Sequence, residues 1–324
     1  MPPVQDRPPV NPYLALAIAV LSVSTASIFI RYAQEDAPSL VIAALRLTLA
    51  VVILTPIALM RYRDELRRLS RRRLGFALLS GFFLALHFAT WITSLEYTTV
   101  ASSVVLVSTT PLWVAILTPF ALKEPITRSI LMGMGLALLG GLIVGLNDAC
   151  TWQAGLVCPS LAEMARGQAF LGDLLALAGA VMAALYLIIG RRLRERLSLV
   201  SYIFVVYGMA AIVLLAMTLL ARQPLLGYRP ITYLWLLLLA LIPQLFGHST
   251  YNWALRYVSA AIVSITLLGE PIGSTILAMI LLHEAPTSLK IFGAILILAG
   301  IYIATVGETR RAGKVPVEIG LEEL

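Results

Sequence analysis

Long apolar runs, separated by short polar segments, dominate the chain. Ten of these runs are about 20 residues long, which is the length that an α-helix needs to cross a hydrocarbon core of about 30 Å. Such a helix bonds its own backbone and leaves no peptide group unsatisfied in lipid. We therefore predict an all-α integral membrane protein. Its transmembrane helices are expected at about residues 13–33, 38–60, 74–95, 98–122, 129–147, 170–190, 199–221, 231–255, 258–282 and 288–306.

Composition supports this class. Hydrophobic residues make up 60% of the chain and charged residues 13%, whereas soluble domains carry about 25% charged residues. The net charge of +7 is spread over short loops, so it does not indicate a nucleic-acid partner. The chain has no zinc-protease, serine-hydrolase or phosphate-loop motif. We expect no enzyme, cofactor or metal; the expected partners are the lipid bilayer and a small-molecule substrate.

The second half of the chain repeats the first. One constant offset relates Tyr97 to Tyr257, Pro111 to Pro271, Gly133 to Gly293, and Gly140 to Gly300. Near the start of each half the register slips by one position, as for Val20 and Val181. We divide the chain into a first five-helix module (12–147), an outer loop (148–169), a second five-helix module (170–306) and a tail (307–324). Tandem modules in so apolar a chain are typical of transporters with internal symmetry.

Loop charge predicts the orientation. The 61–73 loop holds seven arginines and the 190–198 loop four. With ten spans, these loops lie on the side of both termini, and the positive-inside rule places that side in the cytoplasm. Five spans is an odd number, so the second module enters from the other side and the 5+5 repeat is inverted. We interpret residues 1–11 as a cytoplasmic tail rather than a signal peptide.

The two cysteines of the chain, Cys150 and Cys158, both fall in the predicted outer loop. On an oxidising face they can pair and pin this loop. The alternative is two unpaired thiols. Without a nearby pair of histidines they cannot complete a zinc shell.

Polar side chains inside predicted spans are candidates for a binding site, because burying them in lipid is costly. The eighth span offers Gln244, His248 and Asn252 at i, i+4 and i+8, and the third offers Phe83, His87 and Trp91 at the same spacing. Each spacing places its side chains on one helix face. Since these two helices are counterparts in the repeat, we expect the stripes to face each other. Tyr186 is a further candidate for the cavity lining. The alternative is that these groups only pack and bond between helices.

Glu270 and Arg46 are charges within the ninth and second spans, where charges are expensive. Either they pair and hold the bundle together, or Glu270 exchanges a proton or binds a cation. Pro111 and Pro271 lie mid-span at equivalent positions, where we expect kinks. Paired interruptions of this kind indicate a binding site near the membrane midplane.

Longer motifs carry a resemblance to a known family. The runs LHFATWITSLEYTTVASSVVLVSTTPLWVAIL with KEPIT, and YNWALRYVSAAIVSITLLGEPIG with HEAPT, resemble the EamA-type modules of the drug/metabolite transporter superfamily. The segment IAALR is similar to that family's second-helix motif. The resemblance covers residues 12–306 and implies ten helices in an inverted repeat and export of small metabolites. It implies motif positions at Arg46, Pro111, Glu124, Glu270, Pro271 and Glu284. Within the family, the chain most resembles the YddG-type aromatic amino-acid exporters.

We therefore expect a multi-pass secondary transporter of the bacterial inner membrane, with both termini cytoplasmic. It would export aromatic or hydrophobic amino acids by alternating access. His87, Trp91, Gln244, His248 and Asn252 are expected to touch the substrate. The alternative is an exporter of organic cations or drugs, proton-coupled through Glu270. A receptor or scaffold has no need of matched mid-span prolines. Downhill facilitation and proton antiport both fit, and we expect a monomer or weak homodimer.

Overall fold

The computed structural model describes residues 8–122, 128–149, 151–152, 156–157, 167–194, 196–258, 263, 266–283 and 285–312. Its helices are α1 (Pro12–Ser24), α2 (Ala26–Gln34), α3 (Ser39–Arg61), α4 (Arg63–Arg67), α5 (Arg71–Tyr97), α6 (Val100–Val107), α7 (Thr110–Leu122), α8 (Arg128–Ala149), α10 (Gln168–Arg194), α11 (Leu199–Leu220), α12 (Pro230–Leu239), the π-helix η1 (Ala240–His248), α13 (Ser249–Ala254), α15 (Gly269–Leu281) and α16 (Ser288–Ala312). Two short antiparallel strands, β1 (Thr151–Trp152) and β2 (Leu156–Val157), are a small departure from the predicted all-helical chain.

Several stretches are long and apolar enough to cross a bilayer. Within the described residues seven qualify: Pro12–Gln34, Ser39–Arg61, Arg71–Tyr97, Val100–Leu117, Gln168–Arg194, Leu199–Leu220 and Pro230–Ala254. Shorter apolar helices lie at Leu131–Val144, Gly269–Leu281 and Ser288–Ala304. Each of these stretches overlaps one of the predicted spans. The chain is therefore built as a multi-pass membrane protein.

Several predicted spans are interrupted rather than continuous. The span at 13–33 breaks at Thr25, whose hydroxyl donates to the carbonyl of Ser22 at 2.7 Å. The span at 98–122 breaks between α6 and α7, where the hydroxyls of Thr109 and Thr110 donate to carbonyls three residues back at 2.7 and 2.8 Å. Such hydroxyls compete with the helical backbone for its carbonyls. In the span at 231–255, η1 contains Pro243, which has no N–H to donate.

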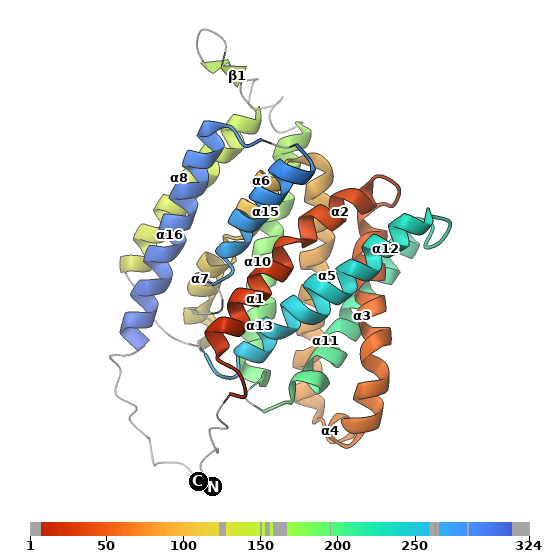
Figure 1. Cartoon of the computed structure of the whole chain (residues 1–324). Helices are drawn as coiled ribbons and strands as arrows, with labels where there is room; N and C mark the ends of the chain where they lie inside the picture. Colours follow the sequence, from red (N-terminus) through yellow and green to blue (C-terminus); the bar gives the residue numbers. More distant parts are fainter. Residues whose placement is uncertain are drawn as a thin grey trace.

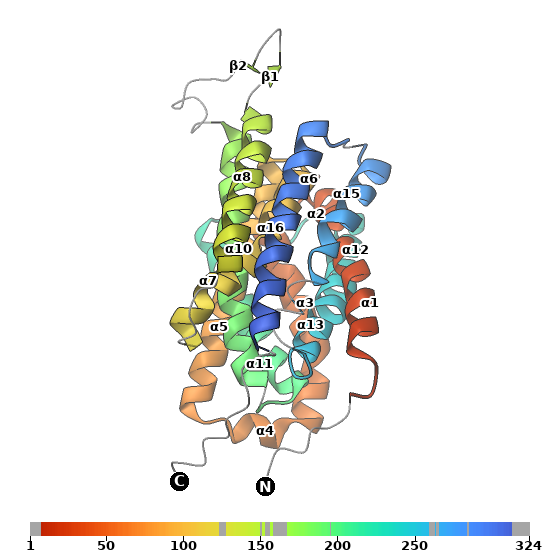
Figure 2. The same ribbon diagram turned by 90° about the vertical axis from the view of Figure 1, so that its left-hand side faces the viewer.

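Helices far apart in the sequence pack side by side. α5 packs on α10, α3 on α11, and α8 on α16. Figure 1 shows α8 and α16 together at the left-hand edge of the bundle, and in Figure 2 the same two helices face the viewer. A Cβ built on Gly140 would lie 2.6 Å from the carbonyl oxygen of Gly293, and one built on Gly133 would overlap the carbonyl of Gly300. Since one numbering rises as the other falls, the two helices are antiparallel. Glycine lets helices approach this closely in lipid.

Matching hydrogen bonds tie the ends of helices in the two halves of the chain. Arg31 Nη2 donates to Thr98 O at 3.1 Å, and Arg191 Nη1 donates to Val258 O at 3.2 Å. Gln34 Nε2 donates to Ile92 O at 2.9 Å, and Arg194 Nε donates to Asn252 O at 2.9 Å. In both pairs of bonds, the two donors and the two acceptors are related by the same offset as the sequence repeat. The two sets lie at opposite ends of the bundle, because α2 ends near the top of Figure 1 and α10 near the bottom.

One end of the bundle holds the start of α1, the whole of α4 and the last turn of α16 (Figures 1 and 2). β1 lies at the opposite end. The arginine-rich 61–73 segment therefore lies at the end of the molecule where the helical bundle both begins and finishes.

Candidate functional site

A small cavity lies in the middle of the bundle. It occupies about 60 Å³ among α5, α7, α10, η1, α13 and α15. His87, Trp91, Tyr186, His248 and Glu270, all singled out from the sequence, line it. Its volume is well below the roughly 300–1,000 Å³ of typical ligand pockets. In this conformation the helices must therefore separate before the cavity admits a whole metabolite.

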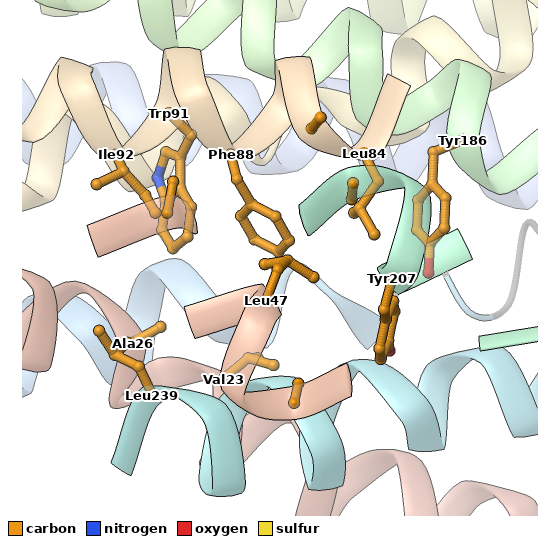
Figure 3. Packing of buried hydrophobic residues seen from close by; sticks show 14 of the residues in the cluster. Val23, Ala26, Leu47, Leu84, Phe88, Trp91, Ile92, Tyr186, Tyr207 and Leu239 are labelled. Carbon is orange, nitrogen blue, oxygen red and sulfur yellow. The ribbon is translucent and has the colours of Figure 1, made fainter. Parts of the chain in front are cut away.

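Aromatic rings form much of the surface around this cavity. The rings of His87 and Trp91 stack with centroids 5.9 Å apart and planes 11° apart. The ring of His248 meets the edge or face of Phe88 at 5.4 Å and that of Tyr251 at 6.2 Å. Figure 3 shows Phe88 and Trp91 projecting from the same side of α5. Such rings offer a large apolar surface to a solute that is itself apolar or aromatic.

A hydrogen bond to the backbone determines which ring nitrogen of His87 is available to a ligand, and whether it donates or accepts. Its Nδ1 lies 2.9 Å from the carbonyl oxygen of Gly179 on α10. A carbonyl only accepts, so Nδ1 carries the proton, and Nε2 of the neutral ring is an acceptor. A Cβ at Gly179 would lie 3.3 Å from Trp91 Cβ, so this glycine also lets α10 approach α5 closely. His87 thus suits a ligand N–H or O–H rather than a carboxylate.

Gln244 and Asn252 are buried but do not line the cavity, contrary to expectation. Gln244 Oε1 accepts from Arg46 Nε at 3.0 Å. Asn252 Nδ2 donates to the Tyr186 hydroxyl at 2.5 Å and to the carbonyl of His248 at 2.8 Å. The reason is length: eight residues of helix rise about 12 Å. A small cavity reaches only the middle residue of the stripe, His248.

The two helix faces that were expected to meet are also paired differently from the prediction, which set Phe83, His87 and Trp91 opposite Gln244, His248 and Asn252. The ring contact between these two helices joins Phe88 to His248, which occupy equivalent positions in the two halves of the sequence repeat. Leu84, Phe88 and Ile92 are therefore the counterparts of Gln244, His248 and Asn252, and Phe83 does not line the cavity. Sequence reasoning missed Tyr251, which does line it. Tyr251 is the counterpart of Trp91, so applying the repeat offset to Trp91 would have found it.

Arg46 is fully buried beside the cavity. Its Cζ lies 4.2 Å from the centroid of the Phe88 ring, and its Nη1 and Nη2 have no hydrogen-bond partner among the described residues. Glu270 lies in the first turn of α15, on the cavity wall. Among the described residues, ion pairs join Arg229 to Glu35 and Asp36. Arg46 and Glu270 do not come within the 4.0 Å of an ion pair, so the first of the two alternatives, an ion pair between them, is not seen in this structure.

Pro111 and Pro271 do not line the cavity, although the residue before each of them, Thr110 and Glu270, does. Pro111 is the second residue of α7 and Pro271 the third residue of α15, so each lies at the start of a helix rather than in the middle of one. Cys150, Cys158, Glu124 and Glu284 lie outside the described residues.

Comparison with known proteins agrees with this architecture. The model of the EamA-like transporter family matches residues 11–146 and again residues 170–306. A solved structure titled "Crystal structure of protein" is 19% identical, with a TM-score of 0.62 over 93% of this chain and 98% of its own, so the two share a fold. No curated protein matches. Since the two family matches cover most of the sequence, the chain belongs to the EamA-like transporter family.

Proposed function

We propose that the protein is a secondary transporter that exports amino acids with aromatic or hydrophobic side chains across the bacterial inner membrane by alternating access. The observation that carries this proposal is the central cavity. Its wall combines the stacked rings of His87 and Trp91 with the carboxylate of Glu270. A transporter needs such a mixture of apolar and polar contacts to bind a small solute away from water.

The two five-helix modules, residues 12–147 and 170–306, form an inverted repeat in this proposal. The antiparallel contact of α8 and α16 supports it, because the pairing of Gly133 with Gly300 becomes that of Gly293 with Gly140 when the repeat offset is applied. The equivalent bonds of Arg31 and Arg191 at opposite ends of the bundle support it as well. The cytoplasmic placement of both termini rests on the arginines of the 61–73 segment.

Alternating access requires contacts that open at one end while the other stays closed. At one end Asp36 Oδ2 accepts from the backbone N–H of Arg229 and the hydroxyl of Thr232, both at 2.8 Å. At the other, Glu65 Oε2 accepts from the hydroxyls of Ser198 and Ser201 at 2.5 and 2.7 Å. Each set joins the first module to the second. Both sets of hydrogen bonds are formed in this conformation.

Transport by purified protein in liposomes tests the proposal. Labelled phenylalanine or tryptophan should be carried by the wild type, and Trp91→Ala should lower the rate at least tenfold. Trp113→Ala is the matched control, because Trp113 lies in α7, donates to Thr109 just before that helix, and does not line the cavity. Absence of transport by the wild type, or equal rates for Trp91→Ala and Trp113→Ala, would contradict it.

The second candidate is an exporter of organic cations or drugs, which is favoured by the carboxylate that Glu270 presents beside aromatic rings. Competition between labelled phenylalanine and a cationic dye separates the two. Transport with and without an imposed pH gradient then distinguishes proton antiport from downhill facilitation.

A further inference from the structure

Two opposite charges at the centre of the bundle are held apart. Arg46 on α3 is fully buried, Glu270 on α15 lies on the cavity wall, and the two do not form an ion pair. Neither group has an ion-pair partner within 4.0 Å among the described residues, so the site is suited to a ligand that supplies groups complementary to both.

The guanidinium of Arg46 is oriented rather than free to turn. Its Nε donates to Gln244 Oε1 at 3.0 Å, and its Cζ lies over the ring of Phe88, 4.2 Å from the centroid. Neither contact uses Nη1 or Nη2, and neither of these nitrogens has a hydrogen-bond partner among the described residues. The edge of the guanidinium that carries them therefore has two donors to offer a ligand. Two parallel N–H groups on one edge match the two oxygens of a carboxylate.

Further donors without partners lie nearby. Trp91 Nε1 and Tyr251 Oη are buried and have no hydrogen-bond partner within the described part of the chain. Both residues line the cavity. Buried donors are costly unless an acceptor satisfies them. Together with the free edge of Arg46, these donors favour a ligand group rich in acceptors, as a carboxylate is.

Two other groups of the cavity wall favour a cation. Glu270 contributes a carboxylate to the wall, and His87, whose Nδ1 donates to Gly179, contributes an acceptor nitrogen rather than a donor. An ammonium group has three donors and no acceptor, so it matches these two groups. The stacked rings of His87 and Trp91 supply an apolar surface beside them.

We infer that the central site selects zwitterions: Arg46 binds the carboxylate of the solute and Glu270 its ammonium group. This inference rests on the proposed transport function and chooses between its two solute classes. A solute with an ammonium group alone would leave Arg46 unmatched and place a second positive charge near it. A solute with a carboxylate alone would leave Glu270 unmatched in the same way.

Phe88 connects Arg46 to the cavity wall in this conformation. Its ring contacts both the guanidinium of Arg46 and the ring of His248, which lines the cavity. In the proposed cycle this ring moves as α5 and η1 separate, and a solute in the cavity then reaches Arg46. The binding of a carboxylate is thereby coupled to the opening of the cavity.

Three probes that share one phenyl ring test the inference. They are phenylalanine, phenethylamine, which lacks the carboxylate, and 3-phenylpropionate, which lacks the ammonium group. Each competes with labelled phenylalanine for purified protein, and its transport is measured in liposomes. The wild type should bind phenylalanine at least tenfold more tightly than either analogue.

Substitutions of Arg46 and Glu270 test which residue binds the carboxylate of the solute and which binds its ammonium group. Arg46→Gln should remove the preference over phenethylamine while the amine still binds, and Glu270→Gln should remove the preference over 3-phenylpropionate. Arg46→Lys, which keeps the charge but loses the paired N–H edge, should fall between wild type and Arg46→Gln. Thermal midpoints show whether each variant is folded, and the analogue comparison on the wild type stands even if one is not.

The failures of the two proposals are distinguishable. If the wild type carries phenylalanine but binds phenethylamine equally tightly, selection of zwitterions is wrong and transport stands. The same conclusion follows if folded Arg46→Gln keeps the wild-type preference. If the wild type carries none of the three probes, the proposed transport of such solutes fails, and the inference fails with it.

Discussion

The close contact between α8 and α16 makes a quantitative prediction about Gly140. Substitution by alanine would place a Cβ 2.6 Å from the carbonyl oxygen of Gly293 and 2.8 Å from Ile297 Cγ1. Neither neighbour can yield without moving a helix, because one is backbone and the other lies in the same interface. Overpacking of this kind costs roughly 1–3 kcal/mol.

Gly135→Ala is the matched control. Gly135 lies on the same helix, and a Cβ there would meet nothing within 4 Å. Both substitutions gain about 1 kcal/mol of helix propensity, so this gain cancels in the comparison. The difference between the two variants therefore reports the packing contact alone, at roughly 1–3 kcal/mol in favour of Gly135→Ala.

Thermal unfolding of the detergent-purified variants, followed by the fraction of protein that stays monodisperse after heating, measures this difference. Gly140→Ala should have an apparent Tm a few degrees below that of Gly135→Ala. Gly293→Ala should behave like Gly140→Ala, because each glycine faces the carbonyl of the other. Equal Tm values for Gly140→Ala and Gly135→Ala would refute the claim that glycine is required for this contact.

Two contacts outside the spanning segments and the two cysteines of the sequence give three further predictions. Burial alone would raise the pKa of Glu65, but hydrogen bonds from Ser198 and Ser201 hold it below its ordinary value. Its stabilisation is therefore present above the ordinary pKa and lost as the pH falls through the lowered one. Because Glu65 is partly exposed and solvent screens its interactions, Glu65→Ala should cost only about 0.5–1 kcal/mol at pH 7. Acidification to pH 4 should lower the Tm of this variant less than that of the wild type. The backbone N–H of Arg229 and then the Thr232 hydroxyl lower the pKa of Asp36, so Asp36→Ala should speed hydrogen exchange at the start of α12, and unchanged exchange would count against this capping role. Non-reducing mass spectrometry should find Cys150 and Cys158 joined, and two free thiols would reject that pairing.

The helices were predictable from the sequence because the length of an apolar run is a local property. The interruptions were harder to predict. The break before α7 comes at Ser108 and Thr109, ahead of Pro111, because neighbouring hydroxyls take carbonyls from the backbone. The contact of Glu65 with Ser198 was also missed, since an acid in an arginine-rich loop looks solvated until the loop is placed against α11.

The site was predictable in part. His87, His248 and Glu270 stood out because polar groups are rare at membrane depth. Tyr251 did not, because an aromatic side chain in a membrane helix is most often packing. Which buried polar residues line a cavity also depends on how high along the helix each one lies. The position of the cavity along the helix follows from three-dimensional packing. For this reason His248 lines the cavity, whereas Gln244 and Asn252, one turn before and after it, do not.

The π-helical turn of η1 has a consequence for the cycle as a whole. Its counterpart in the first half, α5, is an uninterrupted α-helix from Arg71 to Tyr97. The two halves are thus related without being interchangeable, and exchanging their roles does not regenerate the same binding surface. A solute that arrives from one compartment meets walls that differ from those met from the other. Its dissociation constants on the two sides of the membrane should consequently differ, even where net flux is zero.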